Sequence, residues 1–441
     1  MRRLLFLVVL FSATQLFAQG LFDNAVENER QASPSQNYEL NGYLRSVFYG
    51  GKIADTDDYE MKSGYGEAAL KLRFRKESFG DAFAEVRFRK GLEFNENLAE
   101  VNLREAYINA YVGKFDFRVG HQIVVWGRAD GFNPTDNVSP KNMLVRSPNE
   151  DDKREGSFVV RSFFNLTPLR FEGIWVPAFF SSVLPLQAIS LPEGISITDP
   201  DYPDANLKNG AYAIRLNLEL PSLDCSISYF NGFNPLPGVD MGTPYFTMSG
   251  LEMSLIPKAY RMNIFGADFS TTLGSFGLRG EFAYREPHKD FTSFVHIPNP
   301  ELQYVFGFDK EIGDFSLICQ YVGKYVRDFE DLSAPVNPLE LPEYEVRLKN
   351  RMLSSQLDEL SHAVSFRPAF KLMHETLNLE LLGLYNFTTE EYLCRPKVSY
   401  DIADELDFAI GGEIYAGPDG TLFGEMDNFL TAIFFELKSS F

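Results

Sequence analysis

The sequence has few of the residues from which common catalytic and metal sites are built. Its 441 residues include only two tryptophans, three cysteines and five histidines. The cysteines are odd in number and lack metal-ligand spacing, which indicates neither a disulfide framework nor a zinc site. The histidines lie in no hydrolase or metalloprotease motif such as GxSxG or HExxH. We therefore expect no enzyme, and no catalytic residue, cofactor or bound metal.

Positive charge and long apolar segments are also scarce. The chain has 41 basic and 61 acidic residues, a net charge of -20, and such a surface would repel the phosphates of nucleic acid. No apolar run reaches the ~20 residues that a membrane-spanning helix requires. The sequence therefore predicts neither a nucleic-acid-binding protein nor a helical membrane protein.

The first residues have the order of a secretory signal peptide. Arg2 and Arg3 precede an apolar run, and small and polar residues end the segment after Ala18. This order predicts a signal peptide over residues 1–19 and export from the cytoplasm. The polar residues 20–37 predict a short periplasmic N-terminal tail.

From Tyr38 onward the sequence divides into about 18 segments of strand length, with 16 as the alternative count, in which apolar and polar residues alternate. The predicted strands are 38–49, 66–76, 81–90, 101–112, 115–126, 157–165, 169–177, 210–220, 223–231, 259–271, 275–285, 301–310, 314–326, 362–372, 376–387, 391–402, 406–416 and 429–441.

The connections between these strands tend to alternate in length. Tight turns such as 113–114 and 273–274 are followed by long, polar, proline-rich connections. Short turns on the periplasmic side and long loops outside are typical of outer-membrane barrels. We predict an all-β fold: a transmembrane antiparallel up-and-down β-barrel over residues 38–441, without a second domain.

The last ten residues form a two-faced strand that ends on phenylalanine. An amphipathic final strand of this kind looks like the signal read by the machinery that inserts β-barrels into bacterial outer membranes. The residues that would carry this assembly signal are Phe435, Leu437 and Phe441. An even number of strands would return Phe441 to the periplasmic side.

One face of the early strands is apolar and predicted to meet lipid, so the alternate side chains should face a wet lumen. The inward set contains a basic ladder of Arg45, Lys71, Arg73, Arg75, Arg87, Arg89 and Arg118. These residues could form a positive wall that selects anionic or zwitterionic solutes. Alternatively, they only solvate and cross-brace the inside of a large barrel.

A barrel of about 18 strands is too wide for its own side chains to fill. The connection 127–156 contains the turn-forming segment 131–134 and could fold inward to form a constriction. Its candidate residues are Trp126, Arg128, Asp130, Asp136, Lys141 and Arg146. The alternative is an outer lid without selectivity. The acidic residues 150–152 of this connection are expected on an external loop, where they could bind divalent cations or simply be solvated.

Several segments together resemble a family of functionally uncharacterised bacterial outer-membrane β-barrel proteins, distantly porin-like. The most specific is 120–127 (GHQIVVWG), which is followed by 130–136 (DGFNPTD). Shorter segments are 206–209, 212–215, 229–233, 266–268 and 279–284. The resemblance implies the fold and an outer-membrane location more firmly than it implies a substrate.

Taken together, these features predict a porin-like channel in the bacterial outer membrane for passive passage of small hydrophilic solutes, with anions favoured if the basic ladder faces them. A surface adhesin or structural outer-membrane protein is the first alternative, and an outer-membrane enzyme the second. The expected partners are outer-membrane lipid and lipopolysaccharide, the barrel-assembly machinery and small solutes, whereas the oligomeric state stays open.

Overall fold

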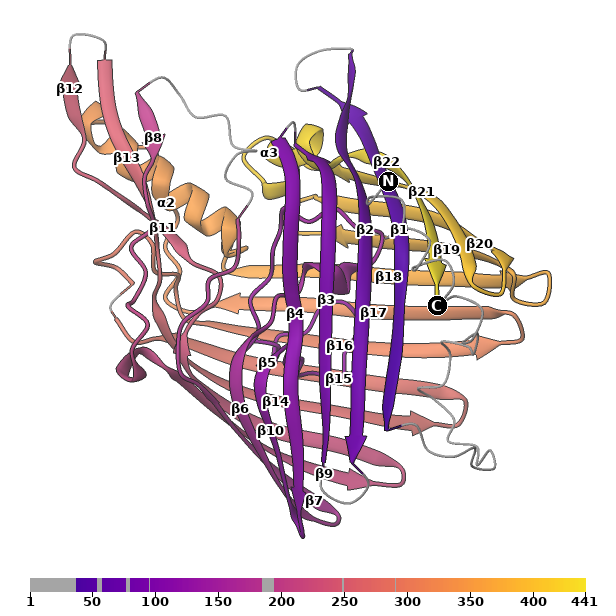
Figure 1. Ribbon diagram of the computed structural model, residues 1–441. Helices are drawn as coiled ribbons and strands as arrows, with labels where there is room; N and C mark the ends of the chain where they lie inside the picture. Colours follow the sequence, from indigo (N-terminus) through magenta and orange to yellow (C-terminus); the bar gives the residue numbers. More distant parts are fainter. Residues whose placement is uncertain are drawn as a thin grey trace, which may run out of the picture.

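The computed structural model describes residues 37–53, 58–76, 80–94, 96–184, 194–247, 250–289 and 291–441. The predicted signal peptide and nearly all of the predicted tail lie outside these residues. The described chain forms one closed antiparallel sheet of 18 strands (Figure 1). The barrel strands are β1 (Tyr38–Lys52), β2 (Tyr59–Lys76), β3 (Gly80–Glu93), β4 (Glu96–Val112), β5 (Phe115–Gln122), β6 (Ser157–Leu166), β7 (Leu169–Val176), β9 (Ala211–Leu220), β10 (Leu223–Phe233), β14 (Arg261–Leu273), β15 (Phe276–Pro287), β16 (Glu301–Ile312), β17 (Phe315–Val326), β18 (Leu360–Leu372), β19 (Leu377–Asn386), β20 (Tyr392–Ala403), β21 (Leu406–Ala416) and β22 (Ala432–Ser440).

The barrel closes where the first strand pairs with the last. β1 and β22 are antiparallel neighbours in a register that runs from Tyr43 opposite Ser440 to Gly50 opposite Ile433. Beyond this register, the N–H of Gly42 donates to the carbonyl of Phe441 at 2.9 Å, and the N–H of Phe441 donates back at 3.0 Å. Closure removes both sheet edges, which would otherwise leave backbone groups unpaired. The predicted up-and-down barrel of 18 strands is confirmed.

The two ends of the barrel differ, as the spacing of the strands predicts. At the short-turn end, tight hairpin turns use Gly113 and Gly274 with left-handed φ angles of 62° and 61°, a conformation that glycine adopts without steric cost. The long connections, which include 123–156 and 327–359, leave from the opposite end, called here the long-loop end.

The strands present alternating faces. On β2 the outward Leu70, Leu72 and Phe74 are exposed, whereas the intervening Lys71 and Arg73 face inward and are half-buried. An apolar outer wall and a polar inner wall agree with the predicted division of faces.

Several predicted strand limits were wrong. β2 and β4 begin earlier than predicted, at Tyr59 and Glu96 instead of residues 66 and 101. β5 ends at Gln122 instead of residue 126, because the chain leaves the sheet there: the N–H of Ile123 donates to Glu105 and that of Val124 to the Ser139 hydroxyl. β22 begins at Ala432 instead of residue 429, because helix α3 (Leu422–Leu430) precedes it. The hydroxyl of Thr421 caps this helix by accepting the N–H of Gly424.

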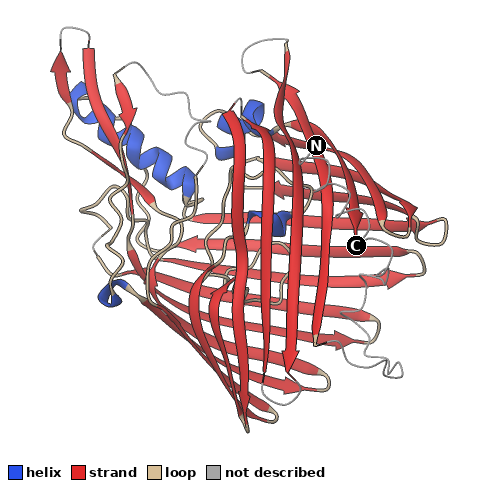
Figure 2. Ribbon diagram, in the orientation of Figure 1, coloured by secondary structure: helices blue, strands red, loops and turns tan. Residues whose placement is uncertain are grey.

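A small second sheet at the long-loop end was not predicted. It contains β8 (Ile195–Ile197), β11 (Gly238–Met241), β12 (Tyr245–Thr247) and β13 (Gly250–Lys258). Helix α2 (Leu341–Leu353) lies beside this sheet, at the upper left of Figure 2. Asn350 of α2 fixes the contact, since its side chain accepts from the N–H of Val239 at 2.8 Å and donates to the Val239 carbonyl at 2.7 Å. No helix in the described part of the chain has the length and apolar character needed to cross a membrane.

Candidate functional site

Residues 123–156, called here the inward loop, fold into the barrel and touch strands on all sides of it. The loop reaches Arg45 on β1, Arg87 on β3, Glu281 on β15 and Arg395 on β20. Because these strands lie around the whole circumference, the loop crosses the lumen and does not cover one wall only.

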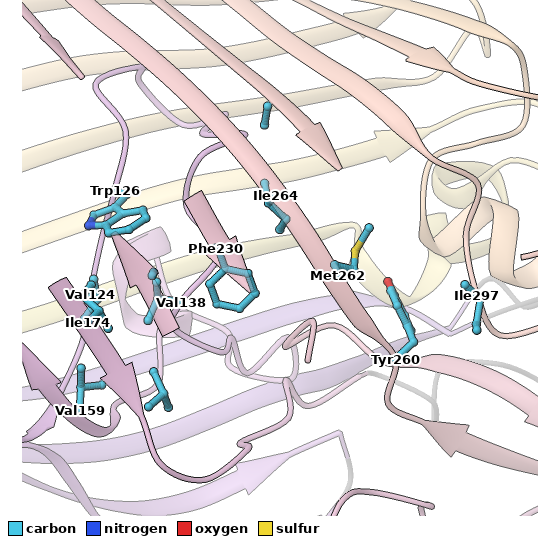
Figure 3. Packing of buried hydrophobic residues seen from close by; sticks show 13 residues of the cluster. Val124, Trp126, Val138, Val159, Ile174, Phe230, Tyr260, Met262, Ile264 and Ile297 are labelled. Atoms are coloured by element: carbon cyan, nitrogen blue, oxygen red, sulfur yellow. The ribbon is translucent and has the colours of Figure 1, made fainter. Parts of the chain in front are cut away.

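Apolar side chains of the barrel wall pack against the first part of the inward loop. Val124, Trp126 and Val138 pack against inward side chains of β6, β7, β9, β10, β14 and β15. Figure 3 shows Trp126 and Val138 near Ile174, Phe230 and Ile264. Each such buried aliphatic or aromatic side chain contributes roughly 1.5–3 kcal/mol relative to exposure. One part of the inner wall is therefore apolar and covered by the loop, whereas the sequence predicted inward side chains that face a wet lumen.

Glu281 of β15 holds the next part of the loop. One carboxylate oxygen accepts the backbone N–H groups of Arg128 and Ala129, both at 2.6 Å. The other accepts the hydroxyl of Thr135 at 2.9 Å. Glu281 is fully buried, so these hydrogen bonds replace the water that its charge would otherwise require. This part of the loop therefore wraps around the carboxylate of Glu281 on β15.

Asp152 anchors the last part of the loop against β1 and β3. Its two carboxylate oxygens pair with Arg45 and Arg87, each at 2.7 Å. Burial would raise the pKa of Asp152, but the charges of Arg45 and Arg87 hold it well below its usual range. The expectation that residues 150–152 are solvated was therefore wrong for Asp152, whereas Glu150 and Asp151 are exposed. The carboxylates of Glu150 and Asp152 are counter-charges of inward arginines, a pairing between residues far apart in sequence.

Two further ion pairs join the loop to the strands near the closure. Arg146 donates to Glu413 of β21 at 2.8 Å, and Glu150 pairs with Arg395 of β20 at 2.5 Å. Arg395 also binds Glu413 at 2.9 Å, so the four side chains form one network.

The other candidate residues of the loop have different surroundings. Trp126 is buried, and its indole N–H donates to Glu172 at 3.4 Å. Arg128 pairs with Asp268, and Asp136 pairs with Arg154 of the same loop. At the inner tip, Asp130 pairs with Arg367 of β18 at 3.2 Å. The exposed Lys141 forms no ion pair with a described residue and lines a cleft.

The predicted basic ladder is divided by these contacts. Its members near the loop are buried in ion pairs: Arg45, Arg87 and Arg89 all approach Glu67, at 2.9, 3.9 and 3.0 Å. Closer to the short-turn end, Lys71 lies 3.8 Å from Glu85. Arg75 pairs with Glu39 at 3.4 Å in solvent.

Arg73 and Arg118, the remaining two members of the ladder, have aromatic partners. Arg73 lies 5.6 Å from the Phe83 ring centre and Arg118 lies 4.3 Å from that of Tyr107. Arg118 also donates to Asn109 at 2.8 Å. Neither arginine has a carboxylate partner in the described ranges, so both keep an unneutralised charge.

Two clefts lie on opposite sides of the inward loop. The first, about 470 Å³, lies toward the long-loop end between loop residues 131–134 and the inner wall of β16–β19, beside α3. The second, about 360 Å³, lies toward the short-turn end and is lined by four arginines, Arg118, Arg161, Arg170 and Arg215, together with Asp116, Glu172 and Glu219. The first cleft is lined partly by the loop, whereas the second is separated from it by Glu172 and Arg215, which contact Trp126.

Several residues of this arrangement were not among the sequence-based candidates. Asp152, Glu172 and Asp268 each neutralise an arginine of the inner wall or of the loop. Arg161 and Arg170 line the second cleft. Strand alternation identifies most of them as inward residues, but it does not distinguish a solvated charge from one that meets the loop.

Comparison with known proteins gives a likeness in structure only. No family model and no curated protein matches the sequence. A BenF-like porin from Pseudomonas fluorescens Pf-5 has a TM-score of 0.54 at 8% identity, over 92% of this chain and 98% of that one. The outer membrane protein opdK from Pseudomonas aeruginosa has a TM-score of 0.53 at 9% identity, and OccAB4 from Acinetobacter baumannii 0.53 at 11%, each over 92% of this chain and 98% of the other. The resemblance to porin-like barrels is confirmed for the fold.

Proposed function

We propose that the protein is an outer-membrane channel through which small hydrophilic solutes diffuse passively. The observation that carries the proposal is a pair of clefts inside a closed barrel, one lined partly by the inward loop and the other by Glu172 and Arg215, which contact Trp126 of that loop. The loop narrows the lumen by spanning it, and its tip leaves the first cleft beside β16–β19. In this proposal, residues 123–156 set the pore size, which is the role expected for Trp126, Arg128, Asp130, Asp136, Lys141 and Arg146.

We propose further that the short-turn end of the lumen favours anions. Arg73, Arg118 and Arg170 face the lumen without a carboxylate ion pair among the described residues, and each lies on an aromatic ring. Unneutralised cations next to low-dielectric walls raise the local concentration of anions. Arg45, Arg87 and Arg89 contribute less to selectivity than the sequence indicates, because their charges are already neutralised beneath the loop. Their proposed role is to hold the loop.

The location belongs to the same proposal. An apolar outer wall and the predicted signal peptide over residues 1–19 fit export and insertion into the outer membrane, with the short-turn end in the periplasm. The C-terminal residues Phe435, Leu437 and Phe441 would be read by the barrel-assembly machinery. The outer wall would contact outer-membrane lipid and lipopolysaccharide.

Planar-bilayer recordings in a salt gradient test both parts of the proposal. The purified protein should give discrete conductance steps, and its reversal potential should indicate anion preference. The triple variant Arg73→Gln, Arg118→Gln, Arg170→Gln should shift the reversal potential toward cations. A matched control removes three cations from the outer face, Lys76→Gln, Lys90→Gln and Lys310→Gln, and should leave the potential unchanged.

The recordings also separate the alternatives. Equal reversal potentials for the two triple variants would refute anion selection by these arginines. Absence of any conductance from correctly folded protein would refute the channel and favour an adhesive or structural role. Hydrolysis of lipid or peptide by the same preparation would instead favour an enzyme.

A further inference from the structure

The outer wall of β5–β7, β9, β10 and β14 contains a large apolar hollow, called here the outer hollow. Its volume is about 820 Å³. Its rim and sides include Phe117, Phe171, Ile214, Leu216, Tyr229 and Phe265. These side chains alternate with lumen-facing residues, so the hollow opens toward the membrane and not toward the pore.

Two small residues form the floor of the hollow. Ser162 and Gly173 lie opposite each other in the β6–β7 register. Phe117 is the next neighbour of Ser162 on β5, and Ile214 is the next neighbour of Gly173 on β9. Large side chains thus flank a pair of small ones across four adjacent strands. The depression is therefore built into the strand register and does not depend on a flexible loop.

Aromatic pairs border the hollow on two sides. Phe115 and Phe164 have ring centres 4.9 Å apart near the short-turn end. Tyr229 and Phe265 have ring centres 4.9 Å apart on the other side. Such pairs hold their side chains in fixed positions and keep the hollow from collapsing.

A cation, called here the rim cation, lies beyond the lining residues of the hollow on its long-loop side. Arg261 shares the outward face of β14 with Asn263 and Phe265. Its guanidinium donates to the carbonyl of Gly210 at 2.8 Å and to that of Lys208 at 3.3 Å. Over the described ranges no carboxylate forms an ion pair with Arg261, and the side chain of Lys208 is exposed. An outward charge on a membrane barrel is tolerated at the headgroup level and costs more toward the middle of the bilayer.

The neighbouring outward acid does not cancel this charge. Glu286 lies opposite Asn263 in the β14–β15 register, but it is paired with Arg327 at 3.1 Å. In a chain whose net charge is -20, an apolar hollow topped by Arg261 and Lys208 is a local site for an anionic amphiphile.

We infer that the outer hollow binds a phosphorylated, acylated lipid of the outer leaflet, the lipid A part of lipopolysaccharide. Acyl chains would fill the space above Ser162 and Gly173, and a phosphate would accept hydrogen bonds from Arg261. A second copy of the barrel fits less well, because a rigid convex wall would bridge the hollow without filling it. The inference depends on the proposed outer-membrane location and is independent of conduction.

Native mass spectrometry of the detergent-purified full chain with bisphosphorylated lipid A tests this site. Arg261→Gln removes the rim cation, and Ser162→Phe fills the floor. Each should lower the bound fraction at limiting lipid by about tenfold, the effect of losing one charge-assisted hydrogen bond or a comparable apolar contact. Ser162 is preferred to Gly173 for this purpose, because a Cβ at Gly173 would already lie 3.2 Å from the Ser162 hydroxyl.

Matched controls isolate the two contributions. Lys90→Gln removes an exposed outward cation of β3, and Ala68→Phe adds an aromatic ring to the outer wall of β2, both away from the hollow. Both should retain wild-type binding. Dephosphorylated lipid should bind wild-type protein about tenfold more weakly, which is a measurement that needs no variant.

Three results would overturn the inference. Arg261→Gln could weaken binding no more than Lys90→Gln, or Ser162→Phe no more than Ala68→Phe. The wild-type protein could instead appear as a lipid-free dimer that Ser162→Phe dissociates, which would assign the hollow to a second copy. A barrel that binds lipid A but conducts no ions would leave the inference intact and remove only the channel proposal.

Discussion

Asp152 of the inward loop and Arg45 of β1 form a buried ion pair, with 2.7 Å between the carboxylate and guanidinium atoms, although 107 residues separate them in sequence. This contact explains how Arg45 of the inner wall and Asp152 of a long connection can both be buried although each is charged. It also makes the position of the loop open to a direct test.

Asp152→Asn should loosen the inward loop. Removing one partner of a buried ion pair costs roughly 3–5 kcal/mol, and here the change takes one counter-charge from both Arg45 and Arg87, which keep Glu67 and Glu85 respectively. We expect a larger mean single-channel conductance with more frequent transitions between levels. The neighbouring Asp151 has a 73% exposed side chain, so Asp151→Asn should leave the recordings unchanged. Equal conductance for the two variants would show that Asp152 does not hold the loop.

Glu281→Gln should release the tip of the loop. An amide has one oxygen instead of two, so it cannot accept all the hydrogen bonds that Arg128, Ala129 and Thr135 donate to Glu281. We expect faster hydrogen–deuterium exchange of the backbone amides in residues 127–136. Glu380→Gln changes an inward carboxylate of β19 for which no contact with the loop is seen, and serves as the control. Unchanged exchange in Glu281→Gln would contradict this anchoring role.

The strands could be predicted from the sequence because their signal is local. Outward Leu70 and inward Lys71 already differ within two residues, and turn glycines such as Gly113 mark where the strands reverse. Face, register and closure then follow from alternation and from the even strand count.

The inward loop could be proposed but its contacts could not be predicted. Alternation places Arg45 inside the barrel, but whether water or Asp152 meets it depends on how a distant segment folds. Likewise, the apolar, strand-like residues before Ala432 gave no local sign of helix α3, which depends on its cap at Thr421. Long-range partners and helix caps therefore account for most of the differences between the predicted and the observed structure in the inward loop and at helix α3.

Acidification should weaken one contact between the external loops. His296 is buried in the connection between β15 and β16. Its Nδ1 lies 3.4 Å from a carboxylate oxygen of Asp240. The charges of Asp201, Lys258 and Lys289 also act on the imidazole. Burial lowers the pKa of His296 from its usual 6.5, a change that Asp240 opposes and Lys258 reinforces. The folded loop therefore binds a proton less readily than an open one. The contribution of neutral His296 to the stability of the folded loop is complete above the ordinary histidine pKa. It declines as the pH falls toward and through the lowered pKa of the folded protein.

Hydrogen–deuterium exchange, corrected for intrinsic rates, measures this effect. Protection of residues 238–241 should fall between about pH 7.5 and about pH 5, the interval in which histidine titrates. His296→Gln should remove most of this pH dependence, whereas His374→Gln, in the turn between β18 and β19, should retain it. A His296→Gln protein with the wild-type pH response would show that another group is responsible.

Phe441→Ala should separate the proposed assembly signal from the stability of the barrel. The backbone of Phe441 pairs with Gly42 whatever its side chain, and the residue is 41% exposed, so the folded barrel should lose little stability. If the ring is read by the assembly machinery, cells should contain much less inserted protein, whereas the purified variant should still refold in detergent micelles like the wild type. Phe74→Ala is the matched control, because Phe74 lies on the outer wall of β2 near the same end and is 45% exposed. Heat-modified gel migration measures both quantities. Equal loss of inserted protein in the two variants, or impaired refolding of Phe441→Ala alone, would mean that Phe441 acts through packing and not as a signal.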